Sequence, residues 1–343
     1  RRAGPPLLDR MRIGIAGVGR IGRFHAQVLR EHPEVSSVVV IDADRTRAET
    51  VAESLHANVA EDESAMLANV DGVVICTPTD THEALITRAV QAGVPVFCEK
   101  PVALDLAATR RVVQLVEDRA AIVQIGFQRR FDAGYRAARA AVAQDAMGRI
   151  YTVRIAGHDP APPAESYIPT SGGIFRDLHI HDFDIARWVL GQEIVEVYAQ
   201  GAVRVDDMFA RHGDVDTIVG TLTFSDGTLG VMTGGRHNPL GYDIRLELFG
   251  SKDSVVVGWD TRTPMHSLEA DMPPAPEHAY ANFLERFEAA YRAELHAFVD
   301  VVAGRTHTPC SVADAETALL VALACDRSRL EHRPVTIDEL RAI

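Results

Sequence analysis

Short apolar runs alternate with helix-like patterns through the first third of the chain. The apolar runs cover residues 13–16, 38–41, 72–76, 94–98 and 121–125. Helical spacing of apolar positions lies at residues 22–29, 81–92 and 105–118, and Asp105 is placed to cap the last of these helices. Repeated units of this kind predict a doubly wound parallel α/β sheet, in which ligands bind beyond the carboxyl ends of the strands.

The pattern changes beyond about residue 130. Strand-like segments lie at residues 149–155, 217–224, 228–234, 242–249 and 254–258, with a hairpin signal at 225–227. They predict an α+β domain with an open, mainly antiparallel sheet. Helical stretches at 279–304 and 312–331 would pack against the first domain or brace the junction. We therefore expect a disordered extension at residues 1–10, a nucleotide-binding domain at 11–130 and an α+β domain at 131–343.

A glycine-rich motif joins the first apolar run to the first helix. Residues 17–22 read GVGRIG, the G-x-G-x-x-G pattern in its required place between a strand and a helix. Gly17 would permit the tight turn, Gly19 the approach of a pyrophosphate, and Gly22 close packing of helix on strand. Arg20 and Ile21 would stand at the helix N-terminus, whose N–H groups bind phosphates. The motif predicts a Rossmann domain, although alone it also fits a turn in a protein without a nucleotide.

An acidic residue follows the second apolar run. Asp42 lies twenty positions after Gly22, where a carboxylate accepts hydrogen bonds from the adenosine ribose and would repel a 2′-phosphate. The spacing therefore favours NAD over NADP. Arg45 leaves NADP open, because a nearby arginine can accommodate the extra phosphate, but this side chain could equally lie against the adenine.

Lys100 lies two positions after the fourth apolar run, at the end of the strand where a ligand is expected. The next residue, Pro101, restricts the backbone of Lys100 to extended values and so helps to fix its direction. A lysine there could place a positive charge beside a hydroxyl that is losing its proton. A surface lysine at a strand exit explains the position equally well.

The segment GGIFRDLHIHDFDIARWVLG, at residues 172–191, is the second candidate site. Its apolar spacing predicts an amphipathic helix that ends at Gly191. Asp177 and His181 are four positions apart and would share one face, and a histidine held by a carboxylate is a good general base near neutral pH. We interpret Asp184 and Arg187 as an ion pair on the helix surface.

The same segment also permits a metal site. On a helix, His179 and His181 would point nearly opposite ways and could not share a metal ion, whereas on a strand they would align. Because the apolar spacing is helical, the pattern favours a site without a metal.

Composition narrows the classes of partner. The net charge of −13 argues against a nucleic acid, which needs clustered positive charge. No apolar run reaches about eighteen residues, so no membrane span is predicted, and the first ten residues lack the apolar core of a secretory signal. The four cysteines form no C-x-x-C pair, which favours a reduced, cytoplasmic protein.

Taken together, these segments resemble the glucose–fructose oxidoreductase, inositol dehydrogenase and rhizopine catabolism family of NAD(P)-dependent oxidoreductases. The resemblance covers nearly the whole chain from Met11 and rests on GVGRIG at 17–22, EKP at 99–101 and GGIFRDLHIHDFD at 172–184. Inositol 2-dehydrogenases look most similar, through GFQRRFDAGY at 126–135 and GYDIRLELFG at 241–250.

The resemblance implies a role for each matching residue. Lys100 matches the lysine that contacts the substrate hydroxyl and the nicotinamide ribose, His181 matches the base, and Asp177 matches the acid beside it. Asp42 matches the ribose acid. The implied cofactor contacts further along the chain are Thr77, His82, Glu99 and Gln128. The implied polyol contacts are Arg129, Asp159 and Tyr242.

The implied reaction is NAD-dependent oxidation of a secondary hydroxyl of a cyclic polyol, most closely myo-inositol to its 2-keto product. Gln128, which stands where some inositol enzymes have methionine, and the unaligned loop at 158–171 leave the substrate open. An aldose or another sugar derivative is the first alternative. A sensing regulator without turnover and a metal hydrolase are alternatives of other classes. The family commonly forms dimers or tetramers through the outer face of the second sheet.

Overall fold

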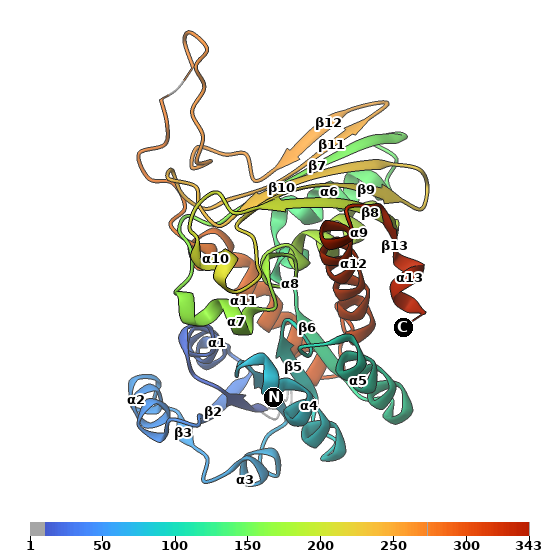
Figure 1. Cartoon of the computed structure of the whole chain (residues 1–343). Coiled ribbons are helices and arrows are strands. Elements are labelled where there is room, and N and C mark those ends of the chain that lie inside the picture. Colours follow the sequence, from blue (N-terminus) through green and yellow to red (C-terminus); the bar gives the residue numbers. More distant parts are fainter. Residues whose placement is uncertain (1–10, 273, 343) are drawn as a thin grey trace, which may run out of the picture. The chain divides into compact units, whose positions relative to one another are not determined.

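The computed structural model describes residues 11–272 and 274–342, so the expected extension at residues 1–10 lies outside the described part of the chain. The chain forms two compact units (Figure 1). The first unit runs to Phe127 and also includes Tyr291–Glu316, and the second unit comprises Gln128–Ala290 and Thr317–Ile343. No helix within the described residues is long and apolar enough to cross a membrane.

The first unit contains a six-stranded sheet in the order β3-β2-β1-β4-β5-β6, and all neighbouring strands are parallel. The strands are β1 (Met11–Ala16), β2 (Val35–Ile41), β3 (Asn58–Val59), β4 (Gly72–Ile75), β5 (Val96–Glu99) and β6 (Val123–Gly126). This confirms the predicted doubly wound sheet. The order places the turns after β1 and β4 side by side, at the point where the direction of winding reverses.

Helices connect the strands of this sheet: α1 (Arg20–Glu31), α2 (Arg45–Leu55), α3 (Glu63–Leu67), η1 (Thr79–Thr81), α4 (His82–Gln91) and α5 (Leu106–Arg119). Asp105 caps α5 as predicted, because its carboxylate accepts the N–H of Ala108 at 2.7 Å. The α2 helix was not predicted. Its buried side chains are only Ala48, Val51 and Ala52, so its sequence carries a weak periodic signal.

Branched aliphatic side chains of β1 and β2 form the core of the first unit. Ile13, Ile15 and Val40 are fully buried there. Leu295 and Phe298, from the later part of α11 (Phe283–Val302), pack into the same cluster. The parallel strands are buried because helices cover them, which explains why they read as short continuous apolar runs in the sequence.

The second unit contains a seven-stranded sheet in the order β12-β11-β7-β10-β9-β8-β13. The strands are β7 (Ile150–His158), β8 (Ile194–Ala202), β9 (Thr217–Phe224), β10 (Leu229–Gly235), β11 (Asp243–Gly250), β12 (Ser254–Val257) and β13 (Val335–Thr336). Strand β7 lies between β10 and β11 and pairs with β10 in parallel, so the sheet is mixed rather than a plain antiparallel meander. The other pairs are antiparallel, as expected.

Helices α6, α9 and α12 lie on one face of this sheet (Figure 1). The helices of the unit and its junctions are η2 (Gln128–Phe131), α6 (Ala133–Ala143), η3 (Glu165–Tyr167), α7 (Ile168–Ser171), α8 (Ile174–Asp177), α9 (Ile180–Leu190), α10 (Met208–Arg211), α12 (Val312–Glu331) and α13 (Ile337–Arg341).

The predicted single helix over the second candidate site is in fact two, because α8 ends at Asp177 and α9 begins at Ile180. Gly191 ends α9 in the left-handed region, as predicted, with its N–H on the carbonyl of Arg187.

The expectation that α9 is amphipathic, with an exposed ion pair, is wrong. Nearly every residue of this helix is buried, and Asp184 is only 1% exposed. Asp184 binds Arg130, with donor–acceptor distances of 2.9 and 2.5 Å, while Arg187 binds Glu193 at 2.5 and 2.7 Å. The helix is enclosed by its own unit, so its charged side chains take buried partners instead of facing water.

Candidate active site

The glycine-rich loop has the geometry of a phosphate site. Gly17 has φ +85°, and a Cβ there would lie 2.8 Å from the backbone of Cys76 and Thr77. A Cβ on Gly22 would lie 1.9 Å from the carbonyl oxygen of Gly17. By contrast, a Cβ on Gly19 would meet nothing within 4 Å. Gly17 and Gly22 therefore permit close packing of the chain on itself, whereas Gly19 leaves space in front of the N-terminus of α1, where a pyrophosphate fits.

Asp42 stands at the end of β2 beside this loop. Its Oδ2 accepts the N–H of Val18 at 2.8 Å, and its Oδ1 accepts the N–H of Asp44 at 2.9 Å. The side chain is 7% exposed. The carboxylate is therefore fixed against the phosphate loop, in the position from which an acidic residue binds the adenosine ribose.

The arginine beside Asp42 is Arg47 and not Arg45. Arg47 lies 3.1 Å from Asp42, whereas Arg45 binds Glu49 and the carbonyl of Ala60, each at 2.9 Å. Arg45 is the first residue of α2. Arg47 also lines an open hollow of about 500 Å³ together with Gly19, Arg20, Arg23, Thr46 and Thr50.

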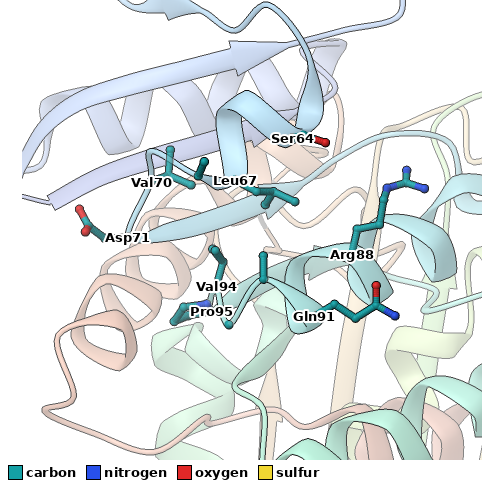
Figure 2. A pocket seen from close by; sticks show the side chains of 11 residues that line it. Ser64, Leu67, Val70, Asp71, Arg88, Gln91, Val94 and Pro95 are labelled. Carbon is teal, nitrogen blue, oxygen red and sulfur yellow. The ribbon is translucent and has the colours of Figure 1, made fainter.

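A larger hollow of about 600 Å³ lies elsewhere in the first unit (Figure 2). Asp71 and Pro95 in its lining precede β4 and β5, so it lies at the amino ends of the strands. Its charged side chains already have partners, because Arg88 binds Glu63 and Asp71 accepts the N–H of Arg12. Since ligands of such sheets bind at the carboxyl ends, this hollow is not the cofactor site.

His82 links the turn after β4 to the segment after β5. Its Nε2 lies 2.9 Å from the carbonyl oxygen of Thr77, and its Nδ1 lies 2.7 Å from that of Pro101. The ring is 1% exposed. The peptide bond between Lys100 and Pro101, which lies in the linked segment, is cis. Among the expected cofactor residues, His82 thus joins Thr77 to the segment that carries Lys100.

Glu99 has a buried partner that the sequence analysis did not identify. Its Oε1 lies 2.6 Å from Nε2 of His25, a fully buried residue of α1. The His25 ring also packs edge-on against Phe97 of β5, with 5.7 Å between the ring centres. His25 therefore holds α1 against β5, the strand that precedes Lys100. A histidine three positions after the last glycine of the motif was the available signal.

In the second unit, Asp159 and Asp177 converge on one guanidinium. Nη1 of Arg236 lies 3.1 Å from Asp159 and 2.9 Å from Asp177. The hydroxyl of Tyr167 donates to Asp177 at 2.9 Å. Burial raises the pKa of Asp159, and the neighbouring charge of Asp177 adds to the rise, while Arg236 opposes it. The structure thus brings two of the predicted residues together through an arginine that sequence reasoning missed.

His181 stands in the first turn of α9, beside a buried charge network. Asp182, the next residue, binds the guanidinium of Arg129 and lies 2.7 Å from Nδ1 of His179. Burial would raise the pKa of Asp182, but Arg129 and His179 outweigh burial and lower it below its usual value. This network fixes the start of α9 and therefore the backbone of His181.

Arg129 lies in the interior of the second unit rather than at an open surface. Its side chain is 1% exposed and also packs on Phe287, at 5.7 Å from the ring centre. The preceding Gln128 is buried too, and its Oε1 has no hydrogen-bond partner in the described structure. Tyr242 is 5% exposed and packs edge-on against the same Phe287, and its burial raises the pKa of the phenol.

The geometry around His179 and His181 does not support a metal site. Within residues 11–272 and 274–342, no group of three or more His, Cys, Asp or Glu side chains is arranged to hold a metal ion. His179 is fully buried, and its Nδ1 is committed to Asp182.

The chain matches two family models. An oxidoreductase family with an NAD-binding Rossmann fold matches residues 11–127, and a GFO/IDH/MocA C-terminal domain matches residues 135–256.

Named relatives cover nearly the whole chain. A myo-inositol 2-dehydrogenase of Thermotoga maritima is 37% identical over 96% of this chain and 99% of its own. An inositol 2-dehydrogenase of Rhizobium meliloti is 37% identical over 95% and 99%. A crystal structure of scyllo-inositol dehydrogenase from Lactobacillus casei, with bound NAD(H) and scyllo-inositol, matches with a TM-score of 0.86 at 29% identity, over 96% of this chain and 99% of that one. The chain therefore belongs to the GFO/IDH/MocA family and is an NAD-dependent dehydrogenase.

Proposed function

We propose that this dehydrogenase oxidises a secondary hydroxyl of a cyclic polyol, with myo-inositol and its 2-keto product as the first choice. The main support is the near full-length similarity to inositol dehydrogenases, which extends over both units. The candidate site agrees with this choice. Asp159 and Asp177 present carboxylate oxygens, which are the acceptors that a substrate with many hydroxyl groups needs.

In the proposed reaction His181 accepts the proton of the hydroxyl that is oxidised. Lys100 stabilises the negative charge that develops on the oxygen, and Asp177 orients the imidazole and favours its protonated form. NAD, when bound, accepts the hydride from the carbon that carries this oxygen. The C–H and O–H bonds of the substrate break, and a ketone, NADH and protonated His181 result. The glycine-rich loop and Asp42 hold the cofactor during this step.

The test is the formation of NADH, followed by its absorbance, with a panel of myo-inositol, scyllo-inositol and common aldoses. We expect turnover of an inositol, with a loss of roughly 10²–10⁴-fold in His181→Ala. His278→Ala is the matched control, because the His278 side chain is 84% exposed and the chemical change is identical. Turnover of an inositol that survives unchanged in His181→Ala would contradict the assigned base.

The panel also separates the alternatives. Turnover of an aldose but of no inositol would identify the sugar dehydrogenase. Tight NAD binding without turnover of any compound would favour a sensing regulator. The ratio of rates with myo- and scyllo-inositol decides which of these substrates is preferred.

A homo-oligomer, either a dimer or a tetramer, forms part of the proposal. The outer face of the second sheet exposes apolar side chains, among them Val219 (53% exposed), Leu229 (56%) and Val256 (43%). Apolar side chains exposed on one face of a sheet are typical of a subunit interface. Sedimentation should therefore give a mass above that of one chain, and Leu229→Glu should lower it. The four free cysteines support a cytoplasmic location, which cell fractionation would test.

A further inference from the structure

Arg236 occupies its position because two strands of the mixed sheet run in parallel. Gly235, the last residue of β10, pairs with His158, the last residue of β7. The residues that follow these strands are Arg236 and Asp159, so both leave the sheet at the same edge. The N–H of Asp159 donates to the carbonyl of Gly235 at 2.9 Å, which fixes the two chain segments against each other.

The Arg236 side chain is built into this edge rather than lying on the surface. It is 4% exposed, and its backbone N–H donates to the carbonyl of Asp216 at 2.8 Å. Burial would lower the pKa of the guanidinium, but the two carboxylates outweigh burial and raise it. Arg236 is therefore a permanent buried cation. A backbone hydrogen bond holds its main chain, and the two carboxylates hold its guanidinium.

The cation allows two carboxylates to occupy one small region. Nη1 of Arg236 lies 3.1 Å from Asp159 and 2.9 Å from Asp177. Without the guanidinium, two partly buried carboxylates so near each other would repel, and one of them would take up a proton or turn away. A protonated or displaced Asp177 would no longer orient the proposed base.

We propose that Arg236 is a positioning residue of the reaction: it holds Asp177 ionised and in place beside the base, and keeps Asp159 available as an acceptor for a substrate hydroxyl. This inference rests on the proposed function. The contacts of Nη1 with both carboxylates support it, since they are the ones that hold the guanidinium between Asp159 and Asp177.

The experiment compares Arg236→Met, Arg236→Lys and Arg236→Ala with the wild type under NAD saturation. Arg236→Met removes the charge at similar length, and misplacement of Asp177 should lower kcat by on the order of 10²-fold. The KM for NAD should not change, because Arg236 is not part of the unit that carries the glycine-rich loop. Arg236→Lys should recover part of the loss. Millimolar guanidinium chloride should raise the rate of Arg236→Ala, since it replaces the missing group.

Controls separate positioning from folding. Arg136→Met makes the same change at an exposed arginine of α6, in the same unit, and it should leave kcat unchanged. The midpoint of urea unfolding is measured for every variant, so that rates refer to folded protein. If the wild type is active and the kcat of Arg236→Met lies within twofold of the wild-type value, this inference is overturned while the proposed function stands. Loss of activity that only follows loss of folded protein, with no rescue by guanidinium, would overturn it too. A wild type that oxidises no polyol would overturn the proposed function and this inference with it.

Discussion

The two units build their parts of the candidate site in different ways. In the first unit, the phosphate loop consists of glycines whose missing side chains let the backbone pack or leave space, and Asp42 is held by the main-chain N–H of Val18. In the second unit, buried ion pairs hold the site, such as Arg236 with Asp177 and Arg129 with Asp182. The candidate cofactor site thus depends on backbone geometry, whereas the candidate substrate site depends on charge balance.

The difference shows which substitutions each unit should tolerate. A site formed by closely packed backbone loses stability or ligand binding when atoms are added, because a new Cβ collides with the chain or with the ligand. A site held by buried ion pairs loses stability when one charged side chain is removed, because the remaining buried charge has no counterion. Substitutions in the two units should therefore have different consequences for stability and for ligand binding.

Asp182→Ala should lower the free energy of unfolding by about 3–5 kcal/mol, because it leaves the buried guanidinium of Arg129 without its partner. Urea unfolding measures the effect. Asp338→Ala is the control, since Asp338 is 84% exposed and pairs with the exposed Arg341 of α13, so the same change should cost about 1 kcal/mol or less. Equal losses in the two variants would show that the buried network has no special role.

Gly22→Ala and Gly19→Ala should separate packing from ligand binding. Alanine at Gly22 would collide with the carbonyl of Gly17, so we expect a loss of about 1–3 kcal/mol in unfolding free energy. Alanine at Gly19 meets open space, so stability should stay unchanged while NAD binding weakens. Calorimetric titration with NAD measures the second effect. Normal NAD affinity in a stable Gly19→Ala protein would mean that the pyrophosphate does not approach this residue.

Asp42→Ala should weaken NAD binding by about 1.5 kcal/mol, or roughly tenfold, because a hydrogen bond from the ribose to a charged acceptor is lost. NADP binding should improve relative to NAD, since the repulsion of its 2′-phosphate disappears. Asp118→Ala is the control, because Asp118 is an exposed acid of α5 that binds Gln114. An unchanged NAD to NADP ratio in Asp42→Ala would remove Asp42 from the ribose site.

Tyr135→Phe should make the protein less sensitive to alkali. Burial raises the pKa of Tyr135 to about 12, above the ordinary value of about 10. The neutral phenol therefore stabilises the fold fully below about pH 10, and this contribution is lost as the pH rises towards 12. At about pH 11 the loss is about 1 kcal/mol. Urea unfolding at neutral and alkaline pH measures it, and the same alkaline loss in the phenylalanine variant would exclude Tyr135 as its source.

Much of the first unit could be predicted from the sequence. Its strands are short apolar runs, its glycines stand in a fixed spacing, and Asp42 follows at the distance that the motif requires. The contact of Arg47 with Asp42 was not predicted, because the sequence does not show which of two nearby arginines turns towards a carboxylate.

Less of the second unit could be predicted. The parallel pairing of β7 with β10 joins segments that lie far apart in the chain, and no local pattern indicates it. The sequence around Arg236 therefore does not show that this residue lies beside Asp159. Asp184 and Arg187 stand at ordinary helix-surface spacing, and only the enclosure of α9 on nearly all sides shows that they are buried. Hydrophobic periodicity identifies elements, but it does not show which charged residues an element takes into the interior.

The central claim is that a hydride passes from a polyol carbon to the cofactor. Its most direct test uses myo-inositol with deuterium on the carbon that is oxidised, together with NAD and the wild-type protein, and mass spectrometry of the NADH formed. We expect the deuterium to be recovered in the NADH. NADH without deuterium would contradict oxidation at this carbon, and the absence of any NADH would contradict myo-inositol as the substrate.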